Sequence, residues 1–212
     1  MIYDIGAHRV RHGDVTDPTM ADELLQGESA HILYSDPPWG DGNIKFWATM
    51  NKKMTGETVE PAPLDRFLSA VFDYAEEHVT DYMLIEYGVR WADEVVRRGE
   101  NAGFTHVDTI DILYRGGGKL LPLHLHTFSR AAAYPEGYAE AVQGAYGYPC
   151  TKLALAPVIQ ALQARQGAEV VVTDPCCGMG YTAQVCVDTG ASFRGNELNR
   201  ARLQKTIDRL SK

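Results

Sequence analysis

The sequence predicts an α/β fold: one mostly parallel sheet with helices on both faces and one antiparallel strand at an edge. First, short apolar runs alternate with segments of helical periodicity along the chain. Second, the glycine-rich segment Arg115–Lys119 separates two extended runs, which is typical of a hairpin. Third, 212 residues with 45% hydrophobic and 23% charged side chains suit one soluble domain spanning residues 1–212.

The individual elements follow from local patterns. Strands are expected where extended apolar runs lie between turn signals, at residues 8–12, 31–34, 82–87, 105–114, 120–128, 169–173 and 192–195. Helices are expected where apolar residues recur every three to four positions, from residue 64, at 91–102, at 153–165, up to residue 188, and at the end of the chain. Pro157 is compatible with its helix only in the first turn. Residues 40–63 are rich in loop signals.

Bulk properties narrow the class of protein. No run of about 18 apolar residues occurs, and the first residues lack the apolar stretch of a signal peptide, so we expect a cytoplasmic protein without a membrane segment. The cysteines show no paired metal-ligand spacing, which favours reduced thiols and no metal site. The net charge of -8 counts against tight nonspecific binding to duplex nucleic acid by this chain alone.

The segment Asp36-Pro37-Pro38-Trp39 follows a short buried strand. It could be only a rigid turn, because proline forces extended geometry on the residue before it. It also suits chemistry on an amine conjugated to a base. The Asp36 carboxylate and the Pro37 carbonyl could both accept hydrogen bonds from the amine and expose its lone pair. Trp39 offers a flat face on which an extruded base could stack.

A second motif, Asp174–Gly180, lies between a predicted strand and a predicted helix. Glycines in such a turn allow a ligand to approach the backbone closely, although an ordinary tight turn has the same composition. Glu197 follows the next predicted strand, where a carboxylate can bind ribose hydroxyls or favour a helix N-terminus. Together the two features indicate an adenosine site.

With these motifs in this order, the chain resembles the amino-methyltransferases that modify adenine N6 or cytosine N4, in the permuted (beta-type) order where the catalytic motif precedes the cofactor motif. The resemblance covers nearly the whole chain. It rests on Gly13-Asp14, on Asp36-Pro37-Pro38-Trp39, on Pro149 and Lys152, on Asp174, Pro175, Cys177, Gly178 and Gly180, and on Gly195, Glu197 and Asn199. Tyr148, Cys176 and Trp39 depart from the commoner residues of the family.

The resemblance implies a Rossmann-like, seven-stranded methyltransferase fold that binds S-adenosyl-L-methionine. It implies that Asp14 approaches the cofactor adenine and that Thr151 and Lys152 lie near its methionine end. The other expected cofactor-binding residues are Asp174, Pro175, Cys176, Cys177, Gly178, Gly180, Glu197 and Asn199. The activity implied is methylation of adenine N6 in DNA. Cytosine N4, adenine in RNA and a noncatalytic nucleic-acid-binding subunit are the alternatives.

Specificity and substrate contacts are less defined by the sequence. Residues 130–147 are too few for an independent recognition module. Relaxed specificity, a specificity-giving partner chain or a substrate other than duplex DNA would each explain this, and a homodimer is also open. The candidate substrate-binding residues are Lys45, Lys52, Lys53, Arg115 and Lys119, which could equally form a solvated basic rim. His124 and His126 alternate on a predicted strand without a third metal ligand, so a polar strand face is favoured.

Overall fold

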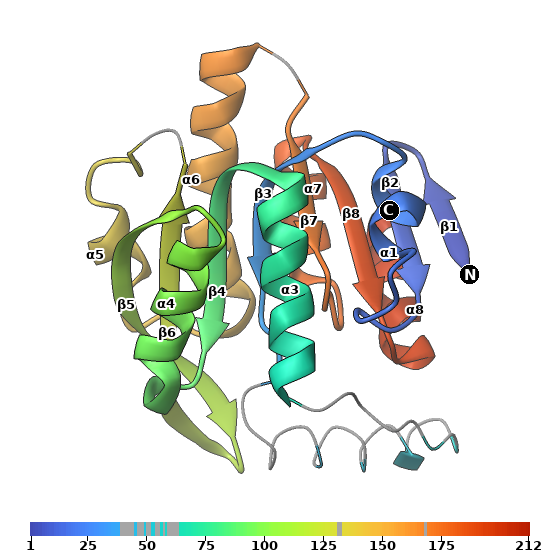
Figure 1. Ribbon diagram of the computed structural model, residues 1–212, viewed down its shortest axis with the longest axis horizontal. Helices are drawn as coiled ribbons and strands as arrows, with labels where there is room; N and C mark the ends of the chain where they lie inside the picture. Colours follow the sequence, from blue (N-terminus) through green and yellow to red (C-terminus); the bar gives the residue numbers. More distant parts are fainter. Residues whose placement is uncertain are drawn as a thin grey trace.

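The computed structural model describes residues 1–38, 64–130, 133–167 and 169–212, with positions 45, 49, 52, 53, 56 and 58 between the first two ranges. Within this part of the chain, eight strands form one mixed sheet in the order β1-β2-β8-β7-β3-β4-β6-β5 (Figure 1). The strands are β1 (Ile2–Ile5), β2 (His8–His12), β3 (Ala30–Ser35), β4 (Val79–Tyr87), β5 (Thr105–Gly116), β6 (Lys119–Ser129), β7 (Val171–Asp174) and β8 (Ser192–Glu197).

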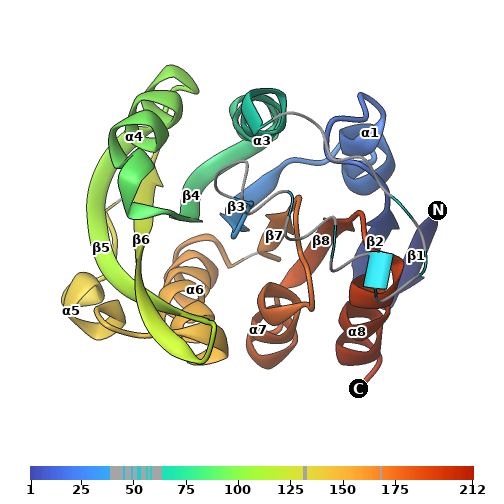
Figure 2. The ribbon, with the colours of Figure 1, turned by 90° about the horizontal axis from the view of Figure 1, so that it is seen from below.

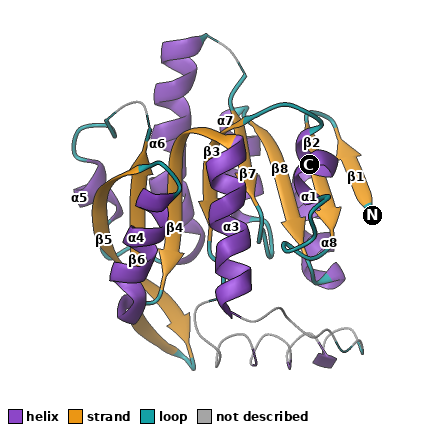
Figure 3. Cartoon of the chain, viewed as in Figure 1, coloured by secondary structure: helices purple, strands orange, loops and turns teal. Residues whose placement is uncertain are grey.

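Helices cover both faces of the sheet, as predicted (Figures 2 and 3). One face carries α1 (Met20–Leu25), α3 (Leu64–His78) and α4 (Ala92–Asn101), which follows the short helix η1 (Val89–Trp91). The other face carries α5 (Tyr138–Val142), α6 (Gly147–Gln166), α7 (Tyr181–Thr189) and α8 (Arg200–Leu210). Each face has its own apolar core because side chains alternate along a strand: Ile32 belongs to the α6 side and Leu33 to the α3 side.

The number of strands and the edge of the sheet differ from the prediction. The described sheet has eight strands, not seven, because β1 pairs antiparallel with β2 through a turn at Gly6, whose φ of 57° lies in the left-handed region. At the other end, the reversed strand β6 does not form the edge. It lies between β4 and β5, antiparallel to both, and β5 is the edge strand.

Two helical features were also not predicted correctly. Helix α6 begins at Gly147, so Pro157 lies in its interior and not in its first turn. Proline lacks the N–H that would bond the carbonyl of Leu153, four residues earlier. Leu153 is exposed, so water can reach this turn of the helix. Helix α1 lies in the polar stretch after residue 14, for which no element was expected.

The parallel strands bring both sequence motifs to one edge of the sheet. Strands β2, β8, β7, β3 and β4 run parallel, so their carboxyl ends lie on the same side, the lower side in Figure 1, onto which Figure 2 looks. Asp36 follows β3, and Asp174 ends the adjacent strand β7. Ligands of open α/β sheets bind at this edge. No helix in the described part of the chain is long and apolar enough to cross a membrane.

Candidate active site

Asp36-Pro37-Pro38 leaves the sheet directly after β3. Pro37 is buried, whereas the Asp36 side chain is exposed at the carboxyl edge. The buried Tyr87 at the end of β4 donates a long hydrogen bond of 3.5 Å to the Pro38 carbonyl. The two proline rings and this contact restrict the path of the chain after Asp36. Trp39 lies outside the described residues, so its stacking role stays a prediction.

The surroundings of Asp36 favour its neutral form relative to a free carboxyl group. Crowding by protein atoms, which removes water, raises the pKa of Asp36 to about 6, and the positive charge of Arg202 acts in the opposite direction. Solvent still reaches this exposed side chain and screens part of the effect, so the upward direction is more informative than its size.

Asp174 is buried and orients the start of the glycine turn. Its Oδ1 accepts hydrogen bonds from the Cys176 N–H (3.1 Å) and the Ser35 hydroxyl (3.2 Å), and its Oδ2 accepts one from the Thr182 hydroxyl (2.7 Å). Burial raises the pKa of Asp174 to about 7, although these hydrogen bonds act to lower it. Asp174 therefore joins β3, the turn and α7, and Ser35 places it beside the catalytic strand.

Glu197 holds the same turn from β8. Its two carboxylate oxygens accept the backbone N–H of Gly178 (2.8 Å) and of Asn199 (2.7 Å). An ionised carboxylate has further acceptor positions, so binding of ribose hydroxyls is compatible with these bonds. Asn199 caps α8 by accepting the Arg202 N–H at 2.9 Å, which is a structural role that its spacing already permitted.

The glycines of the turn allow α8 to approach the backbone. Gly180 has a φ of 79°, and a Cβ there would lie 2.9 Å from the Thr206 Cα atom. At Gly178 (φ 55°) a Cβ would meet only the guanidinium of Arg202, at 2.5 Å. The turn thus presents bare backbone toward the flexible end of one side chain, which is a surface that a ligand could approach.

Three further residues of the turn face the protein interior. The carbonyl of Pro175 accepts a hydrogen bond from the Asn196 side chain at 3.1 Å, and the Cys177 N–H donates to the Asn196 carbonyl at 2.9 Å. Cys177 packs in the core on the α6 side, and Cys176 packs against the core on the α3 side. All four cysteines of the chain, Cys150, Cys176, Cys177 and Cys186, are free thiols.

Asp14 lies beside this turn, after β2. Its Oδ1 accepts hydrogen bonds from the N–H and the hydroxyl of Thr16, at 2.8 and 2.9 Å. The preceding Gly13 donates its N–H to the Glu197 carbonyl at 3.2 Å, so the ends of β2 and β8 remain together. The buried Arg11 fixes this loop through Asp17, Glu23 and the Asn196 side chain.

The structure separates Thr151 from Lys152. Thr151 is buried at the start of α6, and its side chain hydrogen-bonds the Tyr34 hydroxyl of β3. Lys152 is half exposed and pairs with Asp188 of α7 at 3.3 Å. Thr151 therefore lies next to the catalytic strand, whereas the described contact of Lys152 is on α7.

The candidate substrate-binding cations are all exposed. Lys45, Lys52 and Lys53 occupy helical positions within the segment that was expected to be a loop. Arg115 and Lys119 flank the β5–β6 turn, and the Arg115 guanidinium lies 5.6 Å from the ring centre of Tyr146. Exposure is compatible both with contacts to a polyanion and with a solvated rim.

Sequence reasoning missed Tyr34 and Glu86. The Tyr34 hydroxyl donates a hydrogen bond to Glu86, which lies in β4 and is partly buried. Burial and the negative charges of Asp36 and Asp174 raise the pKa of Glu86 to about 8. The available signal was a lone carboxylate within the apolar run Tyr82–Tyr87, close to the end of a strand.

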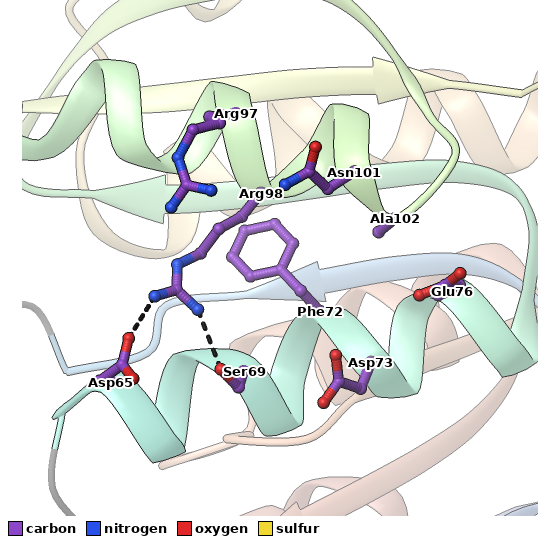
Figure 4. A pocket seen from close by; sticks show the side chains of 9 residues that line it. All are labelled: Asp65, Ser69, Phe72, Asp73, Glu76, Arg97, Arg98, Asn101 and Ala102. Carbon is purple, nitrogen blue, oxygen red and sulfur yellow. Dashed lines mark hydrogen bonds and ion pairs between the residues drawn. The ribbon is translucent and has the colours of Figure 1, made fainter.

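Two other features are separate from this site. No group of three or more metal-ligating side chains occurs in the described ranges, and His126 is buried, not on a polar face. A cavity of about 310 Å³ lies between α3 and α4 (Figure 4). There Arg98 donates to Ser69 at 3.0 Å and pairs with Asp65. No residue of either motif lines it, so it is not the predicted cofactor site.

This architecture is that of solved DNA methyltransferases. The S-adenosylmethionine complex of M1.HpyAVI matches over 96% of this chain and 98% of its own, with 16% identity and a TM-score of 0.62. A DNA modification methylase of Thermus thermophilus, complexed with S-adenosyl-L-methionine, matches over 96% and 93%, with 16% identity and a TM-score of 0.58. The cytosine-N4-specific PvuII DNA methyltransferase matches over 97% and 90%, with 11% identity and a TM-score of 0.58.

The resemblance inferred from the motifs is therefore confirmed for the fold, over nearly the full length of the chain. No protein-family model and no characterised protein sequence matches the chain.

Proposed function

We propose that this chain is an S-adenosylmethionine-dependent methyltransferase that modifies an exocyclic amino group of a base in DNA, with adenine N6 the favoured target. The observation that carries this proposal is the position of Asp36-Pro37-Pro38 beside Asp174 and its glycine turn, at the carboxyl ends of the neighbouring strands β3 and β7. A base bound at the first motif and a cofactor bound at the second would therefore be adjacent. One catalytic domain over residues 1–212 is sufficient for this chemistry.

The donor set suits the cofactor. Glu197 and Asp14 have acceptor positions left after their backbone bonds, as an adenosine site needs. The backbone at Gly178 is covered only by the end of the Arg202 side chain. Thr151 lies toward Asp36, on the side where the methionine end is expected. When bound, the cofactor supplies the sulfonium methyl group that is transferred.

The residues of this chain would prepare the amine. Ionised Asp36 accepts one hydrogen bond from it, and the Pro37 carbonyl accepts another, which directs the nitrogen lone pair toward the methyl group. Rigid alignment matters most for such a displacement, and Pro37 is both cyclic and buried. The proton lost by the methylated amine can pass to Asp36 or to water, both of which are within reach at this exposed edge.

Cytosine N4 in DNA and adenine in RNA are the alternative targets. One solved structure with this fold is cytosine-N4-specific. The aspartate before the two prolines favours adenine by resemblance to the family alone. A partner chain or a second copy could supply the missing recognition module, and cytoplasmic location is the expectation that accompanies this function.

The test is transfer of labelled methyl groups from S-adenosylmethionine to unmethylated duplex DNA, single-stranded DNA and RNA, followed by nucleoside mass analysis. We expect N6-methyladenine in DNA. Asp36→Ala should abolish transfer with cofactor affinity retained. Asp73→Ala, at an exposed aspartate of α3 away from the edge, is the matched control and should behave as wild type. Binding of cofactor and DNA without any transfer would favour a noncatalytic subunit.

A further inference from the structure

A second carboxyl group lies next to Asp36 across the sheet. In the parallel pairing of β3 with β4, Tyr34 is level with Leu84 and Ser35 with Ile85, so the next positions are Asp36 and Glu86. Neighbouring parallel strands are about 4.8 Å apart, and residues at the same level point to the same face. Asp36 and Glu86 are therefore side by side on the α6 face.

Glu86 is held in place by neutral groups. The Tyr34 hydroxyl donates a hydrogen bond to it, and Tyr34 is itself buried and bonded to Thr151. On β6, the residue level with Glu86 is the apolar Leu125. The ionisable groups that face Glu86 are Asp36, Asp174, Tyr34 and Cys150 of α6. In the described part of the chain, no Lys, Arg or His forms an ion pair with Glu86.

Two carboxylates this close cannot both ionise without mutual repulsion. We propose that Glu86 is a positioning residue that carries the proton of this pair, so that Asp36 alone is negatively charged when it accepts the substrate amine. The inference rests on the proposed function, because it assigns Asp36 to the amine. It deepens that function by adding a buried group that sets the charge and orientation of Asp36.

The neighbouring groups determine the direction of each effect. The pKa of Glu86 is raised to about 8 by burial first and by the charge of Asp36 second, and the Tyr34 hydroxyl acts to lower it. Removing Asp36 should therefore lower the pKa of Glu86. Removing the Tyr34 hydroxyl should raise it. Both directions differ from those of a glutamate that only fills space.

The first experiment needs no activity. Carboxyl carbons of the whole protein, labelled with carbon-13 in Asp and Glu, are titrated by NMR. Glu86, assigned with Glu86→Gln, should titrate near pH 8. Its midpoint should fall in Asp36→Ala and rise in Tyr34→Phe. Tyr74→Phe is the control, because it removes another buried hydroxyl, bonded to Thr173 on the opposite face, and should leave Glu86 unchanged. A Glu86 midpoint near 4.5 that ignores Asp36→Ala would overturn the proposal.

The second experiment uses the pH profile of the methyl-transfer turnover number. In the wild type we expect a loss of rate below about pH 6, where Asp36 gains a proton, and above about pH 8, where Glu86 loses its own. Glu86→Gln stays neutral, so it should keep the rate near pH 7 within a few-fold and lose the alkaline decline. A Glu86→Gln variant with an unchanged alkaline limb contradicts the inference. If the wild type transfers no methyl group, the proposed function fails, and the NMR titration still decides the carboxyl pair.

Discussion

Replacement of Gly180 by alanine separates the packing role of the glycine turn from any role in ligand binding. Gly180 combines a φ of 79° with close approach to α8, because a Cβ would lie 2.8 Å from the Thr206 hydroxyl oxygen and 2.9 Å from the Thr206 Cα atom. Real Cβ atoms do not approach other atoms this closely, and the Cα atom belongs to a helix backbone. Helix α8 would have to move.

The magnitude follows from two contributions. An alanine in the left-handed region costs about 1–2 kcal/mol, and forcing a methyl group into a packed site costs about 1–3 kcal/mol. Gly180→Ala should therefore lower the free energy of unfolding by about 2–5 kcal/mol. Gly190 ends α7 with a φ of 70° and has no atom within 4 Å of a Cβ. Gly190→Ala should show the backbone cost alone.

The assay is urea unfolding followed by circular dichroism at a single pH without cofactor. The entropy that alanine removes from the unfolded chain is the same in both variants and cancels in the comparison. We expect Gly180→Ala to be less stable than Gly190→Ala by about 1–3 kcal/mol. Equal unfolding free energies, within about 0.5 kcal/mol, would refute the conclusion that α8 packing requires Gly180.

Further predictions concern the carboxylates and the hairpin. Because the pKa of Asp174 is raised from 3.8 to about 7 in the folded protein, folding retains a proton that the unfolded chain loses, so stability should be full below about pH 4 and fall toward pH 7; in Asp174→Asn, the difference in unfolding free energy between pH 5 and pH 8 should shrink, and an unchanged difference would contradict the assignment. Glu197→Gln leaves one of two backbone N–H groups without its carboxylate acceptor, so we expect a loss of about 1–3 kcal/mol in unfolding free energy together with weaker cofactor binding by calorimetry; lower stability with unchanged affinity would limit Glu197 to holding the turn. Arg115→Ala should weaken DNA binding and reduce the salt dependence by about one ion, whereas Arg97→Ala on α4, exposed but remote from the hairpin, should not.

Local signals in the sequence were sufficient for the element order and for the two motifs. The apolar run before Asp36 forms β3, and the valines before Asp174 form β7, because β-branched residues in short runs specify buried strands. Strands that alternate with helices pair in parallel through right-handed crossovers. Since parallel strands have their carboxyl ends on one side, the placement of Asp36, Asp174 and Glu197 at one edge followed from the sequence.

Other features depended on which distant segments meet. The β1–β2 hairpin and the inner position of β6 depend on strand pairing, which local periodicity does not encode. Pro157 is tolerated inside α6 because the helix runs past it on an exposed side, which only the packed structure shows.

The sequence by itself determined the fold class, the order of the motifs and the residues that end the parallel strands. Tertiary structure decided how those residues are used. The oxygens of Asp174 and Glu197 bind groups far away in the chain, such as Ser35 and Gly178. Glu86 lies beside Asp36 only because β4 pairs with β3 in one register. Hydrogen bonds and charge interactions depend on distance in space, and neighbouring strands bring together residues that are dozens of positions apart.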